Sequence, residues 1–387
     1  MRPELNPFTP GSGLKPPTLA GREAEIAAFD LLVAQSRRAR ATSSIVLYGY
    51  RGVGKTTLLN AMRAQATTAG WLCIDLEAQT SVSGAQSVRQ QLARRLGMAA
   101  VNFKKGKKVT KAVRHALSTL ESFSFTLGAA SMGFSKTSGT RKLSGNIEVD
   151  LEMVVDDFAA ALKESNSAIG VFIDEMQDLD EELLSALLTV QNRAGQNGIP
   201  FYVVGAGLPT LPALLARSRS YAERLFTFLE VGPLTPDAAR RAIVEPLAPY
   251  SFNIEESALQ IVLTESGGYP FFLQIFGREL WLAADERRID LDVAHRALTA
   301  GLQEMDRGIF RARWDRTTAE ERDYLRAMVA TNSAHPRAST VAASANNLSD
   351  DVRASLVRKG IIFVPEPGAV AFTMPGMPSF IARRDAH

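Results

Sequence analysis

Short apolar runs alternate with helical periodicities along the first half of the chain. Such runs lie at 45–47, 71–76, 168–175 and 199–207. Between them, apolar residues recur at the spacing of amphipathic helices, as around 151–163 and 181–194. Continuous apolar runs separated by helices are typical of a parallel sheet that is covered on both faces. The pattern predicts a doubly wound α/β sheet whose ligand site lies at the carboxyl ends of the strands.

The second half of the chain has a different pattern. Helical periodicity alone continues through 234–315 and predicts a helical lid domain. Three short amphipathic helices and two apolar runs around a Pro/Gly turn then predict a winged helix-turn-helix at 316–387. We expect these two domains to follow a flexible Pro/Gly-rich arm at 1–18 and an α/β domain at 19–233. A Lys-rich and then Gly/Ser-rich stretch at about 100–148 is expected to be an insertion in the α/β domain.

A glycine-rich segment that follows the first apolar run carries candidate phosphate-binding residues. Gly49, Gly52 and Gly54 can adopt positive φ and leave backbone N–H groups free to converge on an anion. The spacing is that of a P-loop, in which Lys55, also a catalytic candidate, reaches the β- and γ-phosphates and the Thr56 hydroxyl ligates Mg2+. A glycine-rich turn with a solvated lysine is the plain structural alternative. The predicted cofactor-binding residues of the segment are Gly49, Tyr50, Arg51, Gly52, Val53, Gly54, Lys55, Thr56 and Thr57.

Two adjacent acidic residues follow the apolar run that ends at Ile173. Hydrolysis of ATP needs a carboxylate that organises Mg2+ and a group that positions or deprotonates water. Asp174 is the metal-binding candidate and Glu175 the candidate general base, because the strand would deliver both to the carboxyl edge of the sheet. An acidic strand end that opens a turn is the structural alternative. The sequence contains no N-K-x-D motif for reading guanine, which favours ATP over GTP.

Composition and charge set broader bounds. A chain of 387 residues with 46% hydrophobic content can form two or three domains with cores of their own. The formal net charge is only +3, so attraction to nucleic acid requires local basic patches. No apolar run approaches the roughly 20 residues of a transmembrane helix, and the first residues lack the pattern of a signal peptide. The single Cys73 agrees with a reducing compartment. We expect a cytoplasmic protein that does not contact membranes.

Several segments together resemble a known family. They read LAGREAEI, GYRGVGKTTLL, VFIDEMQDL, SYAERLFTFLEVGPL and GGYPFFLQ, followed by the winged-helix pattern. The chain resembles the origin-recognition-like AAA+ ATPases, which are closely related to the STAND signalling ATPases. The resemblance extends from about residue 19 to the end and is most specific in the two Walker motifs. It implies a P-loop NTPase fold, ATP and Mg2+ as cofactors, and ATPase activity.

The resemblance also implies contacts with the adenine base. The Gly-Arg-Glu box, here Gly21, Arg22 and Glu23, is expected to lie against the adenine. Tyr269 and Pro270, from the Gly-Tyr-Pro sequence of the lid, are expected to close over the base. A plain helix start and a loop-to-helix junction are the structural alternatives.

Arg224 resembles in its placement the arginine finger with which AAA+ proteins complete a neighbouring subunit's site. A finger holds a fixed guanidinium against the charge that develops on the γ-phosphate. This role would require a homo-oligomer. Several arginines lie close by in the sequence, and a solvated surface arginine is the alternative.

Two departures from the family pattern concern the residues that sense the nucleotide. The strand end at 204–207 reads Val-Gly-Ala-Gly, without a polar side chain that could touch the γ-phosphate. Gly-Tyr-Pro-Phe at 268–271 replaces the sensor arginine that is often found at the start of a lid helix. We therefore expect a slow ATPase that reports its nucleotide state by domain rotation.

Double-stranded DNA is a candidate partner. A basic patch without acidic residues comprises Lys104, Lys105, Lys107, Lys108, Lys111 and Arg114. In the third helix of the C-terminal domain, Arg353, Arg358 and Lys359 could contact the DNA backbone. Asp350 and Asp351 place carboxylates at the start of that helix, where a recognition helix meets DNA, although they also suit a helix N-terminus.

Two hypotheses of different classes therefore remain. In the first, an AAA+ protein couples its nucleotide state to assembly and DNA binding. In the second, a STAND-like nucleotide switch acts on a protein partner and does not bind DNA directly. A P-loop small-molecule kinase is disfavoured, because it would have no use for the long C-terminal helical and winged-helix segments.

Overall fold

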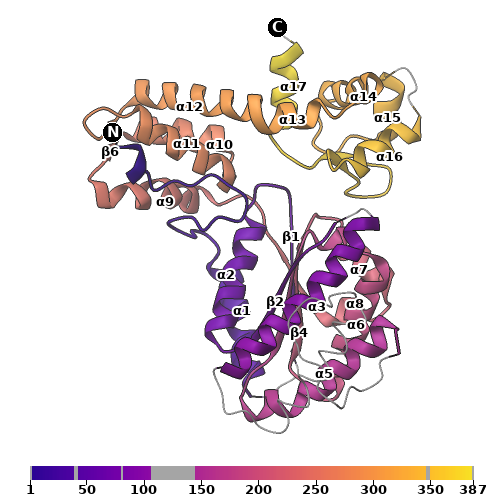
Figure 1. Ribbon diagram of the computed structural model, residues 1–387. Helices are drawn as coiled ribbons and strands as arrows, with labels where there is room; N and C mark the ends of the chain where they lie inside the picture. Colours follow the sequence, from indigo (N-terminus) through magenta and orange to yellow (C-terminus); the bar gives the residue numbers. More distant parts are fainter. Residues whose placement is uncertain (1, 39–41, 80–81, 106–143, 346–348, 386–387) are drawn as a thin grey trace. The chain divides into compact units, whose positions relative to one another are not determined.

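The computed structural model describes residues 2–38, 42–79, 82–105, 144–345 and 349–385 (Figure 1). The chain divides into two compact units. An α/β unit comprises Arg22–Tyr48 and Lys55–Glu230. A mainly helical unit comprises Met1–Gly21, Gly49–Gly54 and Val231–His387. None of the helices within the described ranges is both long and apolar enough to cross a membrane.

A five-stranded sheet forms the centre of the α/β unit. Its strands are β1 (Ser44–Tyr48), β2 (Leu72–Glu77), β3 (Ile169–Asp174), β4 (Phe201–Gly207) and β5 (Phe226–Glu230). They lie in the order β2-β3-β4-β1-β5, and every neighbouring pair is parallel. The predicted doubly wound parallel sheet is confirmed. Because β1, β4 and β3 run parallel, the loops that follow these strands leave the same edge of the sheet.

Helices cover both faces of this sheet (Figure 1). They are α1 (Glu23–Ser36), α2 (Lys55–Thr68), α3 (Val82–Lys105), α5 (Ile147–Glu164), α6 (Glu181–Gln196), α7 (Leu211–Ser218) and α8 (Ala222–Leu225), with the short η2 (Met176–Asp178). Val171 and Ile173 of β3 share one core with α3, α5 and α6. Phe172 faces the opposite side, where its ring lies 6.1 Å from that of Phe29 in α1. The alternation of side chains along β3 thus supplies both cores.

The helical unit contains a bundle that the sequence predicts as the lid. Its elements are α9 (Pro236–Leu247), η3 (Ala248–Tyr250), α10 (Glu256–Ser266), α11 (Pro270–Ala283), α12 (Leu291–Met305), the π-helical η4 (Asp306–Phe310) and α13 (Arg311–Trp314). A parallel pair, β6 (Asn253–Ile254) and β7 (Arg288–Ile289), joins two of its loops. Strands of two residues leave no periodicity in the sequence, which explains why this pair was not predicted.

Part of the N-terminal arm packs on the bundle. The arm contains the turn η1 (Pro3–Leu5), and Phe8 is only 3% exposed. Phe8 occupies the space beside Gly277 of α11, where any Cβ would collide with its ring. The Asn6 side chain donates a hydrogen bond to the backbone carbonyl of Arg278 at 3.1 Å. The segment predicted as a flexible arm therefore contains one aromatic side chain that is buried against the bundle.

The C-terminal part contains the predicted order of helices and strands. Its elements are α14 (Ala319–Ala330), α15 (Ala338–Ser344), α16 (Asp350–Arg358), β8 (Ile362–Phe363), β9 (Ala371–Phe372) and α17 (Met377–Asp385). β8 and β9 form an antiparallel hairpin. The ring of Phe380 in α17 stacks on Phe310 at 5.6 Å between centroids. This contact belongs to one hydrophobic core that includes both the bundle and the C-terminal helices.

Candidate nucleotide-binding site

The loop between β1 and α2 has a backbone that depends on its glycines. Gly52 and Gly54 have φ values of +85° and +93°, in the left-handed region that side chains disfavour. Gly49 is constrained differently, because a Cβ there would collide with the carbonyl oxygen of Val231. Val53 is fully buried and anchors the loop. The glycines therefore allow a ligand to approach the backbone closely, as a phosphate cradle requires.

The next two residues begin helix α2. The N-terminal end of a helix carries a partial positive charge and N–H groups without intrahelical acceptors. Lys55, the first residue of α2, is only 8% exposed. The positive charge of a largely buried lysine thus adds to the positive end of the helix, and both features suit an anionic phosphate.

The two predicted Walker motifs meet through their side chains in the α/β unit. Thr56 Oγ1 donates a hydrogen bond of 2.7 Å to Asp174 Oδ2, although 118 positions separate the residues in the sequence. The backbone N–H of Glu175 donates to the other carboxylate oxygen of Asp174 at 3.0 Å. The parallel sheet explains the contact, because β1 and β3 deliver their ends to the same edge. A hydroxyl and a carboxylate therefore lie within reach of one metal ion.

Burial controls the electrostatics of Asp174. It raises the pKa of the carboxyl group, and the hydrogen bonds from Thr56 and from the Glu175 backbone only partly oppose this. A carboxylate that is costly to ionise in the nucleotide-free protein would gain most from a cation placed beside it.

Glu175 has an unusual backbone conformation. Its φ of +48° and ψ of +41° lie in the left-handed region, which costs a residue with a side chain about 1 kcal/mol or more. Such strain persists where surrounding contacts fix the residue, and it often occurs at functional sites. The next turn supplies one such contact, because Gln177 Nε2 donates to Glu175 Oε2 at 2.7 Å. Gln177 was not identified as a site residue from the sequence. Its position two residues after Glu175 is the only signal in the sequence that could have indicated it.

The predicted Gly-Arg-Glu box lies at the start of α1. Gly21 has a φ of +70°, so glycine is required there. Arg22 is only 7% exposed, and its Nη1 lies 3.6 Å from Glu25 Oε1. Burial lowers the pKa of the Arg22 guanidinium below its ordinary value, and the negative charges of Glu25 and Glu23 oppose this. The start of a helix does not by itself require a buried arginine, so the burial of Arg22 favours a role beyond beginning α1.

The predicted Tyr269–Pro270 pair lies at the junction that leads into α11. Gly267 and Gly268 have φ values of +54° and +73°, and Pro270 is the first residue of the helix. Burial raises the pKa of the Tyr269 hydroxyl. Within the helical unit, the backbone N–H of Phe271 donates to the Gly52 carbonyl at 3.3 Å. The junction therefore lies directly against the glycine-rich loop.

Arg224 lies away from Thr56 and Asp174 within the α/β unit. It is exposed and precedes β5, whose first residue Phe226 pairs with Ser44 at the start of β1. Arg224 is therefore at the amino-terminal edge of the sheet, whereas Asp174 is at the carboxyl end of β3. It contributes to the lining of a cavity of about 380 Å³ with Gln191 and Tyr202. The structure does not bring Arg224 together with Asp174 of its own chain.

Two of the three basic residues proposed to touch DNA have acidic partners within the C-terminal part. Lys359 Nζ lies 2.6 Å from Glu321 Oε2, and Glu321 is only 2% exposed. Arg353 lies 3.3 Å from Asp350 one turn earlier in α16. Arg358, the third candidate, is exposed.

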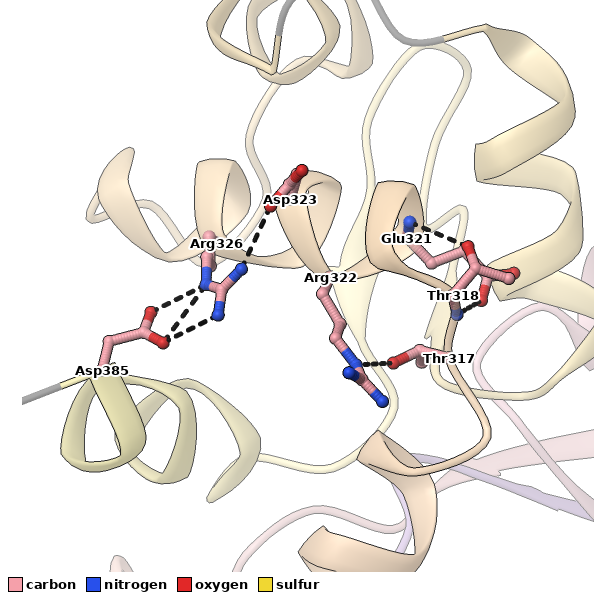
Figure 2. A network of polar contacts seen from close by, with 7 residues as sticks. All are labelled: Thr317, Thr318, Glu321, Arg322, Asp323, Arg326 and Asp385. Atoms are coloured by element: carbon pink, nitrogen blue, oxygen red, sulfur yellow. Dashed lines mark hydrogen bonds and ion pairs between the residues drawn. The ribbon is translucent and has the colours of Figure 1, made fainter. Parts of the chain in front are cut away.

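Glu321 also belongs to a local polar network (Figure 2). The backbone N–H of Thr318 donates to Glu321 Oε2 at 2.7 Å, and Glu321 N–H donates to Thr318 Oγ1 at 3.3 Å. This capping box begins α14. Arg326, further along α14, donates to Asp385 of α17 at 3.0 Å. The Lys359–Glu321 pair thus joins the end of α16 to α14, and the Arg326–Asp385 pair joins α14 to α17.

The predicted lysine-rich patch falls almost entirely outside the described residues. Only Lys104 and Lys105 are included, as the last residues of α3, and their side chains are not described. The same holds for most of the predicted insertion at about 100–148.

Comparison with known proteins agrees with this geometry. Residues 18–204 match the model of an AAA ATPase domain, and residues 307–381 match a domain of unknown function, DUF8462. No curated protein matches the sequence. The structure is similar to the Walker-type ATPase PABY2304 of Pyrococcus abyssi, with 17% identity, a TM-score of 0.60 and coverage of 98% of this chain and 99% of that one. It is also similar to the ADP form of the Aeropyrum pernix ORC2 protein, with 14% identity, a TM-score of 0.53 and coverage of 97% of both chains.

The fold and the two Walker motifs thus define a P-loop NTPase. Residues 18–204 form an AAA+ ATPase domain, and the chain has the fold of the origin-recognition-like AAA+ proteins. The resemblance predicted from the sequence motifs is confirmed at this level, and an AAA+ ATPase domain implies nucleotide binding.

Proposed function

We propose that this chain is a Mg2+-dependent, slowly hydrolysing AAA+ ATPase that couples its nucleotide state to assembly and DNA binding. The observation that supports the proposal most directly is the hydrogen bond between Thr56 and Asp174. It brings together the hydroxyl of one Walker motif and the carboxylate of the other, which are the two protein ligands that a P-loop enzyme offers to its metal.

The residues present fit Mg2+. This ion is usually held by one or two carboxylates, with substrate phosphates and water completing its octahedral shell. Thr56 and Asp174 supply two oxygen ligands, and the Glu175 N–H holds Asp174 in place. Within the described ranges there is no cluster of three His, Cys, Asp or Glu residues that could hold a metal ion without phosphate. When bound, Mg2+ would neutralise phosphate charge.

The chain's own groups would perform the remaining steps. Lys55, at the positive end of α2, would bind the β- and γ-phosphates. Glu175 would accept a proton at its carboxylate from the attacking water. Tyr269 and Pro270, which lie against the glycine-rich loop, would cover the base, as would Gly21, Arg22 and Glu23.

Assembly and slow turnover rest on two further features. Arg224 is exposed and is not brought to the Walker residues of its own chain, which suits a finger directed at a neighbouring subunit. The strand β4 ends in Gly205, Ala206 and Gly207, which have no polar side chain to contact a γ-phosphate. We propose that hydrolysis is slow for this reason.

We also propose that the three helices and hairpin of the C-terminal part form a winged helix-turn-helix. DNA would then be held by exposed basic residues, Arg358 among them, and by the lysine-rich patch. The second candidate function is a STAND-like switch that acts on a protein partner. The pairing of Lys359 with Glu321 and of Arg353 with Asp350 favours this alternative, because these cations are already engaged within the protein.

Calorimetric titration with ATP and Mg2+, followed by a phosphate-release assay, tests the core of the proposal. Lys55→Ala should abolish ATP binding, because the point charge at the phosphates is lost. Glu175→Gln should retain ATP binding and lower hydrolysis by about 100-fold, since an amide cannot accept the proton. Unchanged ATP affinity of Lys55→Ala, or hydrolysis by Glu175→Gln at the wild-type rate, would contradict the assignment.

A further inference from the structure

The turn that follows β3 places one amide side chain between the candidate base and the end of β4. Gln177 Nε2 donates to Glu175 Oε2 at 2.7 Å and to Asp178 Oδ2 at 3.2 Å. Its Oε1 accepts the backbone N–H of Leu208 at 3.0 Å. A single side chain therefore links the carboxylate of Glu175 to the backbone directly after β4.

The glycines of β4 provide the space for this turn. A Cβ on Gly207 would collide with Gln177 Oε1 and with the Leu211 side chain. A Cβ on Gly205 would collide with the sulfur of Met176. A side chain from either position is thus excluded by the turn after β3. Gly205 and Gly207, at the end of β4, thus leave the space that Met176 and Gln177 occupy.

The orientation of the Gln177 amide follows from its partners. The Leu208 N–H can only donate, so it requires the amide oxygen. The NH2 group then faces Glu175 and Asp178, whose carboxylates accept hydrogen bonds. Each end of the amide has a suitable partner, and a reversed amide would pair donor with donor and oxygen with carboxylate.

We infer that Gln177 is a positioning residue for ATP hydrolysis that acts on the candidate base Glu175. Gln177 holds the carboxylate of Glu175 in one orientation through its NH2 group. Because its oxygen is bonded to the Leu208 N–H, a shift of the backbone after β4 would also shift that carboxylate. The inference rests on the proposed ATPase function. It assigns Gln177 no contact with ATP, and so its loss should lower kcat and leave nucleotide affinity unchanged.

A purely structural role is the competing explanation, and one substitution separates the two. Gln177→Glu keeps the size of the side chain and an oxygen that can accept the Leu208 N–H. It cannot donate to Glu175, and it places a like charge beside that carboxylate. Gln177→Ala removes both interactions. If Gln177 only stabilised the turn, Gln177→Glu would retain activity and Gln177→Ala would lose stability.

The test compares wild type, Gln177→Glu, Gln177→Ala and the control Gln196→Ala, in which an exposed glutamine at the end of α6 is replaced. ATP affinity is measured by calorimetry, and kcat and KM are measured by phosphate release with Mg2+. We expect kcat to fall about tenfold or more in both Gln177 variants, as for loss of a group that orients a catalytic residue. KM and ATP affinity should stay within twofold of wild type, and Gln196→Ala should match wild type.

The possible outcomes are distinguishable. Hydrolysis by Gln177→Glu at the wild-type rate would overturn the inference while leaving the ATPase proposal intact. Joint loss of ATP affinity and activity in Gln177→Glu would also overturn it, because the residue would then only maintain the shape of the site. Tight ATP binding by wild type without any hydrolysis would overturn the proposed ATPase function, and the inference with it.

Discussion

Thr56 and Asp174, which lie 118 positions apart in the sequence, form a 2.7 Å hydrogen bond. The same two groups that would ligate Mg2+ thus stabilise each other, although burial makes ionisation of Asp174 unfavourable. We therefore expect the ionised Asp174 carboxylate to lower the stability of the fold, and a bound Mg2+ to offset that cost. Two consequences can be measured separately, one on stability and one on binding.

Asp174→Asn should raise the melting temperature of the nucleotide-free protein at pH 7. An amide can still accept from the Glu175 N–H and can donate to Thr56, and it carries no buried charge. The folded-state pKa of Asp174 is raised, so the stability linked to its protonation is present below the unfolded value and is lost as the pH rises through the folded value. The advantage of Asp174→Asn should therefore appear at neutral pH and vanish in acid.

Differential scanning fluorimetry at several pH values, with and without Mg2+ and ATP, measures both effects. Asp174→Asn should lose the Mg2+-dependent rise in melting temperature. Glu223→Gln, which changes an exposed carboxylate to an amide, is the matched control and should behave as wild type. A lower melting temperature of Asp174→Asn at pH 7 would refute the electrostatic argument.

Arg224→Ala tests whether subunits complete one another's sites. Each Arg224→Ala subunit should bind ATP normally and hydrolyse it slowly, because its own Walker residues are intact. Mixing it with Lys55→Ala protein should restore part of the activity, since one variant provides the finger and the other the pocket.

The control for this experiment is Arg217→Ala, which removes another exposed arginine, in helix α7. It should hydrolyse ATP at the wild-type rate. A mixture of Arg224→Ala and Lys55→Ala that is no more active than its separate components would show that Arg224 does not act in trans.

The contiguous features of the site were predictable from the sequence. The P-loop at 49–57 is a local pattern whose geometry follows from glycine spacing and the start of a helix. The meeting of Thr56 with Asp174 followed from topology, because parallel strands deliver their ends to one edge of the sheet.

Contacts that depend on tertiary packing were not predictable in this way. Gln177 reaches Leu208 across 31 positions, and nothing in the local pattern indicates that Gly205 and Gly207 leave room for it. Phe8 looks like part of a flexible arm until it is seen beside Gly277. Helix α17 follows a Pro- and Gly-rich stretch that obscured it, and its periodicity spans only two turns.

Lys359 provides another example and a prediction about stability. From the sequence it is a free cation at the end of a candidate recognition helix, but it pairs with the buried Glu321. Lys359→Met should destabilise the protein by about 2–3 kcal/mol, because a buried carboxylate would lose its counter-ion. The figure is below that of a fully buried pair, since Lys359 is 26% exposed. Arg358→Met, which replaces an exposed neighbour, should cost less than about 0.5 kcal/mol.

The pH dependence of this cost has a definite sign. Burial alone would raise the pKa of Glu321, but hydrogen bonds from Lys359, Ser355 and the Thr318 backbone outweigh it and lower the pKa. The stability contributed by Glu321 is then present above the ordinary pKa of a glutamate, and it is lost as the pH falls through the lowered pKa of the folded state. Urea unfolding should therefore show a larger cost of Lys359→Met at pH 7 than at pH 4. An equal cost at both values would mean that the ion pair is not the cause.

Lys359 and Arg353 form ion pairs with Glu321 and Asp350, so the lysine-rich patch is the stronger candidate for DNA binding. If lysines there meet phosphates, binding to duplex DNA should fall steeply with salt, depend little on sequence and strengthen with ATP as assembly multiplies weak contacts. Replacing Lys104, Lys105, Lys107 and Lys108 with glutamate should weaken binding by about 100-fold or more at low salt. Replacing Asp350 and Asp351 with alanine should leave it unchanged or tighten it, because two carboxylates are removed from the start of α16.

Fluorescence-anisotropy titrations at several salt concentrations, with and without ATP, measure these effects. The glutamate variant must retain wild-type ATP affinity, so that loss of DNA binding can be assigned to the patch. No retention of DNA by wild type at about 50 mM salt, where even non-specific electrostatic binders hold DNA, would exclude the first hypothesis. We would then expect the exposed surface of the C-terminal part to bind a protein partner. The ion pairs of Lys359 and Arg353 would in that case keep this part rigid, as a nucleotide-controlled switch requires.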